Sequence, residues 1–352
     1  MATHSILNRL PHEPRNQRGF TLIELMISLV IGLLLSAAIV KIYADTSQIY
    51  RFQGAVSEVQ ENGRFASAFL RRTARLAGNF GCDASKPISA STLSDAEATR
   101  LEFYSMASPL PQPAQPIGGV DGGGTNSDEL ILRGSTGGGV RLVAPDPGGP
   151  AADLTVENDS GIAVVAGQDT FGVISDCNRT EIFKINSVGN TAAGDTIDFD
   201  GTLGATYTTA AGARVQEIEE VRYCIGEATA WTAANNLQAL KLLRNPRAGQ
   251  TCARHGEELV EGIQNLQVRY GIDTNNDGFA NRYITAPDPW TTADLANVRT
   301  LRVELVARSL ANGITRAPVP YTLEGNVITP AADDLHLYKV MTSTISLRNK
   351  GT

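Results

Sequence analysis

Residues 18–41 read Arg-Gly-Phe-Thr-Leu-Ile-Glu-Leu-Met-Ile-Ser-Leu-Val-Ile-Gly-Leu-Leu-Leu-Ser-Ala-Ala-Ile-Val-Lys, and the rest of the chain is organised around this stretch. From Phe20 to Val40 the only charged side chain is Glu24. An apolar run of this length can cross the ~30 Å hydrocarbon core of a bilayer as one helix. Because an ionised carboxylate inside such a run costs about 2.5–3.5 kcal/mol, Glu24 is expected to have a function. The sequence therefore predicts a transmembrane helix over residues 20–40.

The helical pattern continues beyond the apolar run. Apolar or small residues recur every three or four positions, at Ile42, Ile49, Phe52, Val56, Val59, Gly63, Ala66, Leu70, Thr73 and Ala77. The other face carries Lys41, Asp45, Arg51, Glu58, Glu61, Arg64, Arg71 and Arg75. No proline interrupts the pattern before Pro87, and Gly78 is a suitable stop. Residues 41–78 are thus predicted to form an amphipathic helix whose apolar stripe packs on the globular domain.

The rest of the chain, residues 79–352, is predicted to be a β-rich domain. Short apolar segments bounded by Gly, Asn or Asp predict strands at 128–133, 162–166, 172–175, 181–188, 196–199, 214–225, 237–243, 259–270, 298–308 and 338–347. Their even spacing favours antiparallel pairing through hairpins over alternating β-α units. The predicted fold class is α+β: a long N-terminal helix packed on a mainly antiparallel sheet.

Charge indicates both the topology and the partners. The chain has 30 Lys and Arg against 37 Asp and Glu, for a net charge of −7, and no basic stripe, so no nucleic-acid partner is expected. Arg9, Arg15 and Arg18 precede the apolar helix, which orients the N-terminus toward the cytoplasm. The sequence therefore predicts a single-pass inner-membrane protein whose C-terminal domain lies in the periplasm.

All four cysteines lie in the outward part of the chain. No pair has C-x-x-C spacing, so disulfides are expected in an oxidising compartment. Cys224 and Cys252 flank an expected hairpin and are predicted to pair, which leaves Cys82 for Cys177. Three connectivities exist for four cysteines, and this is one of them.

Enzymatic chemistry has few candidate residues. After removal of a leader only His255 and His336 would remain, and both are expected to be ordinary surface or loop histidines. No nucleophile–base pair stands out and no histidine has zinc-site spacing, so the chain is predicted not to be an enzyme. An anchored hydrolase is the weakest alternative.

One loop matches the pattern D-x-[DN]-x-[DN]-G of calcium-binding loops, with Gly278 at the sharp turn. Its oxygen-bearing side chains are Asp273, Asn275, Asp277 and Asn281, and Asp288 and Asp294 lie close enough in sequence to add a ligand. The loop departs from an EF-hand because Ile284 stands where the bidentate Glu is required and neither flank is helical. Two interpretations therefore stay open: a Ca²⁺ site flanked by strands, or a hairpin turn that binds nothing.

The stretch Gly19-Phe20-Thr21-Leu22-Ile23-Glu24 resembles the class III signal of type IV pilins and type II secretion pseudopilins. The resemblance implies that a prepilin peptidase cuts after Gly19, removes residues 1–19 and methylates the new N-terminus, Phe20. Small residues at 36–38 could mimic a Sec-type site, but the order Gly-Phe-Thr-Leu-Ile-Glu favours cleavage before the apolar segment. The helix over residues 20–78 would then stay in the mature protein.

Two interpretations of Glu24 follow. The carboxyl group either reaches the membrane interface or stays protonated, which gives it no partner. The resemblance implies instead that Glu24 pairs with the charged N-terminus of Phe20 in a neighbouring subunit and sets the axial register of the assembly.

Further segments resemble the PilW family of minor pilins. They are Glu61-Asn62-Gly63-Arg64-Phe65-Ala66, Ala77-Gly78-Asn79-Phe80-Gly81-Cys82, residues 260–273 and the ending Thr344-Ile345-Ser346-Leu347-Arg348-Asn349. The alternative is that the first two are helix-surface residues and a glycine-rich helix exit. The resemblance implies a structural subunit that joins other minor pilins and the major pilin, after contact with the prepilin peptidase and the inner-membrane assembly platform, and helps to start the pilus near its tip. A J-type pseudopilin and a pilus-displayed adhesin or ligand-binding module are the alternatives.

Overall fold

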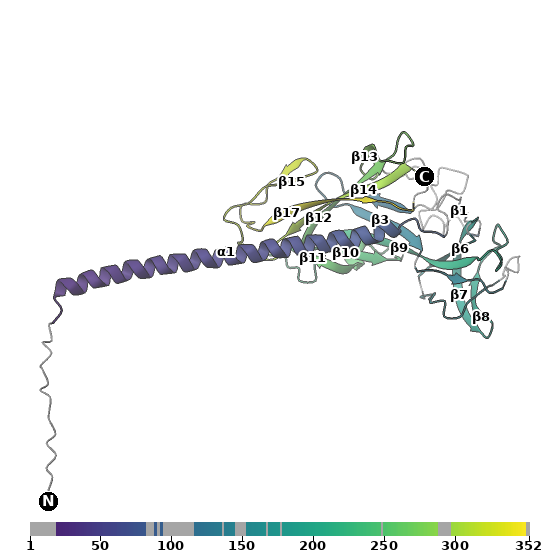
Figure 1. The fold of residues 1–352 in the computed structure, drawn as a ribbon, viewed down its shortest axis with the longest axis horizontal. Helices are drawn as coiled ribbons and strands as arrows, with labels where there is room; N and C mark the ends of the chain where they lie inside the picture. Colours follow the sequence, from purple (N-terminus) through teal and green to yellow (C-terminus); the bar gives the residue numbers. More distant parts are fainter. Residues whose placement is uncertain are drawn as a thin grey trace, which may run out of the picture. The chain divides into compact units, whose positions relative to one another are not determined.

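The computed structural model describes residues 19–81, 88–89, 92–93, 116–135, 137–144, 153–166, 168–176, 178–247, 249–287 and 297–349. The chain divides into two compact units, Met1–Gln53 and Gly54–Thr352. One helix, α1 (Leu22–Leu76), contributes to both units, and the second unit is otherwise mostly β-sheet. The α+β layout predicted from the sequence is therefore confirmed (Figure 1).

Local sequence sets both ends of α1. At its start the hydroxyl of Thr21 accepts a hydrogen bond from the Glu24 N–H at 3.3 Å, which is the first half of a capping box. At its end Gly78 adopts a φ of +80°, a conformation that suits glycine just after a helix. The side-chain amide of Asn349 lies 3.3–3.4 Å from the last helical carbonyls, those of Arg75, Leu76 and Ala77. The chain's C-terminal segment thus caps its N-terminal helix.

The larger sheet has eleven strands in the order β11-β10-β9-β6-β7-β8-β5, with β1, β2, β3 and β4 paired off this path. Its strands are β1 (Ile88–Ser89), β2 (Ile117–Val120), β3 (Glu129–Ser135), β4 (Val140–Arg141), β5 (Leu154–Val156), β6 (Thr170–Ser175), β7 (Thr180–Thr191), β8 (Gly194–Phe199), β9 (Arg214–Glu227), β10 (Gln238–Arg244) and β11 (Glu257–Glu261). Only β1 and β7 pair in parallel among the described strands. The prediction of a mainly antiparallel sheet is confirmed.

A smaller sheet has the order β13-β12-β14-β17, and β15 and β16 form a separate hairpin. The elements are β12 (Ile263–Ile272), β13 (Arg282–Ile284), β14 (Val298–Arg308), β15 (Tyr321–Leu323), β16 (Asn326–Ile328), β17 (Tyr338–Ser346) and the short helix α3 (Cys252–His255).

Two strand predictions need correction. Residues 162–166 are irregular, because Val164 and Val165 stay exposed and pair with no described strand. The strand predicted at 259–270 breaks at Gly262, whose φ is +77°.

The first of two main cores is the helix-docked core, which joins α1 to both sheets. The buried face of α1 repeats every three or four residues, at Ala55, Val59, Gly63, Ala66, Leu70 and Ala74. It packs with buried residues of β3, β9, β10 and β11 from the larger sheet and of β12, β14 and β17 from the smaller one. The amphipathic helix predicted from the sequence is therefore confirmed within the second unit.

The second core is the β-lobe, and it contains no α1 residue among those described. Leu142, Leu154, Val156, Ile174, Phe183, Ile185, Ile197, Phe199, Leu203, Tyr207, Ala213 and Val215 form it. Strand β9 joins the two cores, because Val215 lies in the β-lobe while Val221 and Tyr223 lie in the helix-docked core.

Candidate functional site

The signal-like stretch lies at the N-terminal end of α1. Gly19 and Phe20 precede the helix and are exposed, with Phe20 82% exposed, and Glu24 lies in the first turn. The structure thus brings the predicted cleavage site and the predicted assembly carboxylate onto one exposed helix start.

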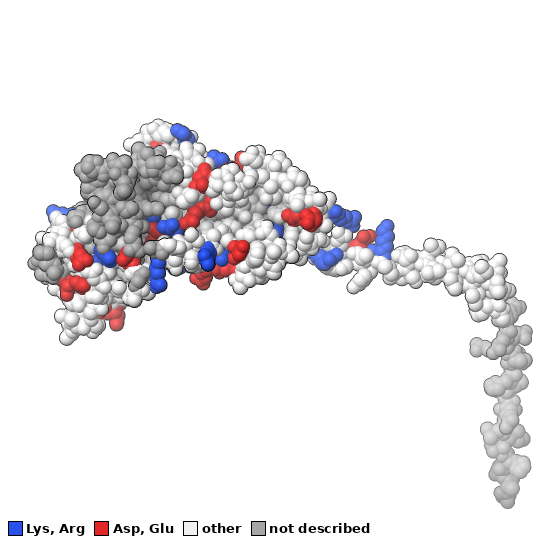
Figure 2. All heavy atoms as spheres, turned by 180° about the vertical axis from the view of Figure 1, so that it is seen from behind, with Lys and Arg blue, Asp and Glu red and all other residues white. Residues whose placement is uncertain are grey.

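The N-terminal turns of α1 are apolar and uncovered. Every large apolar residue from Leu22 to Val40 is more than half exposed. In the described part of the chain α1 is the one helix long and apolar enough to cross a membrane, with a mean hydropathy of 2.5 over its most apolar window. On the face shown in Figure 2 this stretch carries no visible charge, while charged residues of both signs gather over later turns. The helix fits a membrane anchor.

Residues 61–66, one of the segments that resemble the PilW family, dock α1 on the sheets. The Asn62 amide donates a hydrogen bond to the Glu261 carbonyl at 3.2 Å, where β11 passes into β12. A Cβ on Gly63 would lie 2.2 Å from the sulfur of Met341 on β17, so the end of the Met341 side chain occupies the space that a larger residue would need. These residues therefore have a packing role beyond that of a helix surface.

Two further contacts tie α1 to the sheets, and sequence reasoning did not find them. The Arg71 guanidinium donates to the Ser343 hydroxyl at 3.0 Å, and the Thr73 hydroxyl lies 2.7 Å from that of Tyr223. Both join residues at least 150 positions apart. A polar Thr within the apolar stripe of α1 was the one local signal of such a contact.

The predicted calcium loop is a tightly hydrogen-bonded turn. The buried Asp273 carboxylate accepts hydrogen bonds from the N–H groups of Asn276, Asp277 and Gly278 at 2.7–3.2 Å. The Arg299 guanidinium lies 3.3 Å from the same carboxylate. Burial raises the pKa of Asp273, but hydrogen bonds from Gly278, Arg299 and the neighbouring N–H groups hold it below its usual value. Asp273 is thus an anion already surrounded by donors.

The other predicted ligands bond to one another. The Asn281 amide donates to the Asn275 side-chain oxygen at 3.0 Å, and the Asn275 amide donates to Asp277 at 2.9 Å. No three His, Cys, Asp or Glu residues gather at a possible metal site within the described ranges, and Asp288 and Asp294 lie outside those ranges. A hairpin turn accounts for each contact of this loop. Calcium binding stays a prediction.

The disulfide prediction is confirmed for one pair. Cys224 on β9 and Cys252 at the start of α3 are bonded, with their Cα atoms 6.0 Å apart. They close a loop of sequence separation 28, which stabilises the fold by about 3 kcal/mol in the chain-entropy model. The second predicted pair, Cys82 and Cys177, lies outside the described residues.

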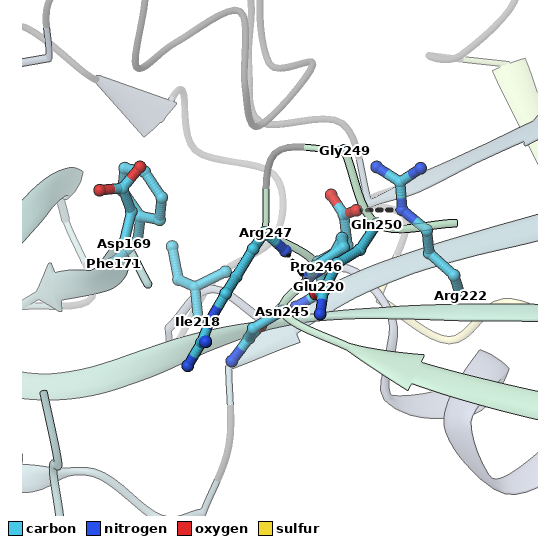
Figure 3. A pocket seen from close by; sticks show the side chains of 10 residues that line it. All are labelled: Asp169, Phe171, Ile218, Glu220, Arg222, Asn245, Pro246, Arg247, Gly249 and Gln250. Carbon is cyan, nitrogen blue, oxygen red and sulfur yellow. Dashed lines mark hydrogen bonds and ion pairs between the residues drawn. The ribbon is translucent and has the colours of Figure 1, made fainter. Parts of the chain in front are cut away.

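A pocket of 320 Å³ lies beside β6, β9 and the loop after β10 (Figure 3). Its buried carboxylate, Glu220, is held by Arg133 at 2.6 Å and by Arg222 at 2.7 Å. Burial raises the pKa of Glu220, but the two guanidinium groups hold it below its usual value. Among the described residues that line it there is no serine, cysteine or histidine, so these residues offer no nucleophile of those types and no imidazole base.

The histidines differ from one another. His255 is exposed on α3, as expected, whereas His336 is buried and its ring nitrogen lies 2.7 Å from the Asp334 carboxylate. The Tyr338 hydroxyl donates to the other oxygen of Asp334 at 2.7 Å. His336 thus lies in a loop, as predicted, but this hydrogen-bonded cluster buries it just before β17.

Two family models match the chain. Residues 14–40 match the prokaryotic N-terminal methylation motif, and residues 222–349 match type IV pilus-assembly protein W. Both matches agree with the resemblance to minor pilins of the PilW family, and each covers less than half of the chain. No curated protein and no solved structure matches the chain. The resemblance drawn from the sequence is confirmed, and the chain has the features of a pilin-like pilus component.

The span that matches type IV pilus-assembly protein W contains the residues that contact α1. Residues 222–349 include Tyr223, Glu261, Met341, Ser343 and Asn349, the contact points for α1 described above. The matched span therefore contains the surface on which α1 docks.

Proposed function

We propose that this chain is a minor pilin: a non-enzymatic subunit cut after Gly19, methylated at Phe20 and incorporated into a type IV pilus. The observation that carries the proposal is the exposed apolar half of α1, which lies within the span matched by the methylation motif, together with the later turns of the same helix, which dock on the PilW-matched strands. Such a helix can be held in the inner membrane first and buried among other subunits later.

The proposal places the domain after residue 78 in the periplasm before assembly and on the pilus afterwards. The disulfide between Cys224 and Cys252 supports an oxidising compartment. The partners would be the prepilin peptidase, the assembly platform, other minor pilins and the major pilin, with a position near the tip where assembly starts. The PilW match favours this role over that of a J-type pseudopilin or a displayed adhesin.

Processing tests the proposal first. Gly19→Val should leave the precursor uncut in the membrane, because a β-branched side chain blocks access to the scissile bond. Mass spectrometry of the wild-type protein should find an N-methylated Phe20 as the first residue. A mature N-terminus after Ala38 would refute the proposal.

The test of Glu24 needs a control, because Glu24 also belongs to the first turn of α1. Glu24→Ala should be processed normally yet fail to enter pili, because the inter-subunit pairing with the Phe20 amine is lost. Thr21→Ala removes the N-cap hydrogen bond and keeps the carboxylate, which costs the helix about 1 kcal/mol and should leave incorporation intact. If Thr21→Ala reproduced the defect of Glu24→Ala, Glu24 would act on its own helix instead of on a neighbour.

A further inference from the structure

Strand β17 is one outer edge of the smaller sheet, and among the described strands it pairs only with β14. The pairing is antiparallel and runs without a register shift from Thr300 opposite Ser346 to Arg308 opposite Tyr338. β17 therefore presents one whole side of its backbone away from β14.

The hydrogen-bond pattern identifies the residues of that free side. The Leu347 N–H donates to the Arg299 carbonyl at 3.0 Å, and the Ser309 N–H donates to the Leu337 carbonyl at 2.9 Å. Because hydrogen-bonded and non-hydrogen-bonded pairs alternate in an antiparallel ladder, the odd-numbered residues of β17 bond to β14. The N–H and C=O groups of the even-numbered residues point outward, at Val340, Thr342, Thr344 and Ser346.

The Tyr321 ring of β15 stacks on Tyr338, the first residue of β17, with ring centroids 5.0 Å apart. Beyond that residue this edge lacks the protections that the other described edges have. β5 and β13 have three residues each, β2 has four, and β1 and β4 have two. β11 carries Glu257, Glu258 and Glu261, and its ladder with β10 contains a register shift. β17 has nine residues, no proline, no bulge and a single charge, Lys339. Natural sheets use such devices to block edge-to-edge pairing, so their absence from one long edge indicates that a strand pairs there.

The side chains of β17 suit strand addition. Met341, Ser343 and Ile345 face α1 and the core, as shown by the contacts of Gly63 with Met341 and of Arg71 with Ser343. Thr342, Thr344 and Ser346 are exposed on the opposite face. Short hydroxyl side chains, β-branched at Thr342 and Thr344, pair well across strands and leave the backbone accessible.

We propose that the free edge of β17 accepts an uncharged β-strand from a different subunit of the pilus, which extends the four-stranded sheet across the subunit boundary. The proposal rests on the proposed function. A second copy paired antiparallel through the same edge, the arrangement that all but one described strand pair adopts, fits poorly for a directional reason. α1 runs in the same direction as β17, because Gly63 meets Met341 while the end of the helix meets Asn349. Two β17 strands paired antiparallel would force two α1 helices to run in opposite directions, whereas helices inserted in one membrane run the same way.

The test uses the full-length chain in its own cells and compares variants of Thr344. Thr344→Pro removes an outward N–H and places a ring on the edge, while all bonds to β14 are kept. Thr344→Ala is the matched control, because it removes the side chain and keeps the N–H. Both should accumulate with the Cys224–Cys252 disulfide intact. The amount recovered in sheared pili should fall at least about tenfold for Thr344→Pro and stay unchanged for Thr344→Ala.

Each contrary outcome refutes a defined part of the proposal. A disulfide-bonded Thr344→Pro chain at wild-type level in pili would overturn strand addition at this edge. Should Thr344→Pro fail to accumulate, Thr342→Lys puts a charge on the exposed face of the same edge next to Glu304, and its normal incorporation would overturn the proposal equally.

Two results would refute the proposed identity of the partner instead of strand addition at the edge of β17. A homodimer of the purified full-length chain in detergent, cross-linked in the wild type and lost in Thr344→Pro, would make a second copy the occupant. Absence of the wild-type chain from sheared pili would refute the proposed function, and with it the choice of a pilus subunit as partner.

Discussion

The helix-docked core and the β-lobe share strand β9 but differ in what they pack. The helix-docked core buries one face of α1 against both sheets, and most of its strands fall within the PilW-matched residues 222–349. The β-lobe packs strands and loops of residues 142–215 on one another and lies outside that match.

The two cores place different demands on the residues that fill them. A helix can lie close to a sheet only where small residues and matched polar groups meet, as at Gly63 with Met341 and at Thr73 with Tyr223. The β-lobe needs only a filled interior, which many combinations of apolar residues supply. The docking surface for α1 therefore depends on particular residue pairs, whereas the interior of the β-lobe depends mainly on its total apolar volume.

The largest expected effects come from emptying each core separately. Phe183 is fully buried in the β-lobe and its ring lies 5.1 Å from that of Phe199, so Phe183→Ala should lower the free energy of unfolding by about 3–5 kcal/mol. Leu70 is fully buried in the helix-docked core, and Leu70→Ala should cost about 2–5 kcal/mol. Hydrogen exchange of the full-length chain should show lost protection in β7 and β8 for the first variant and in α1 for the second.

This pair of variants also tests whether the cores are independent. If Phe183→Ala removed protection from α1 as strongly as Leu70→Ala does, strand β9 would couple the two cores into one cooperative unit. The two cores would then differ only in which residues they pack.

A smaller effect should follow pH and fall on the helix-docked core alone. Asp128 joins the hairpin β2–β3 to β12, because its carboxylate accepts hydrogen bonds from the Gly122 N–H at 2.9 Å and the Val268 N–H at 2.7 Å. Burial raises the pKa of Asp128 to about 6, although these hydrogen bonds oppose the shift. A raised pKa in the folded state favours the protonated form. Its contribution to stability is therefore present below about pH 4 and lost as the pH rises through about 6.

Asp128→Asn isolates this contribution. Between pH 4 and pH 7 the wild type should lose up to about 3 kcal/mol of unfolding free energy more than the variant, measured by denaturant titration at each pH. Exchange protection in the β-lobe should not follow this difference. Equal pH dependence in the two proteins would show that Asp128 titrates normally in the folded state.

The smallest effects compare two glycines of α1. A Cβ at Gly54 would meet nothing within 4 Å, so Gly54→Ala should stabilise the helix by about 0.5–1 kcal/mol. At Gly63 the same change gains the same helix propensity but forces the Met341 sulfur to move, at a cost of about 1–3 kcal/mol for overpacking. Thermal unfolding should therefore give opposite signs for the two variants.

A second change sharpens the glycine comparison. Met341→Ala in the Gly63→Ala background should recover part of the loss, because it removes the atoms that the new Cβ meets. Were Gly63→Ala as stabilising as Gly54→Ala, close approach of α1 to β17 would not be what requires glycine at this position.

The sequence by itself determined the features that depend on local pattern. The apolar run and its carboxylate, the motif around Gly19, the continuation of α1 nearly to Gly78 and most strands follow from periodicity and turn residues a few positions apart. The pairing of Cys224 with Cys252 was also accessible, since both flank one hairpin.

The tertiary structure alone decided what depends on distant contacts. The Asn349 cap on α1 spans more than 270 positions, and the bond between Asp128 and Val268 spans 140. The burial of His336, the turn around Asp273 with its Arg299 partner, and the free edge of β17 likewise depend on which strands become neighbours. No local pattern encodes these, because the free energy of each contact exists only after both cores have formed and brought the distant residues together.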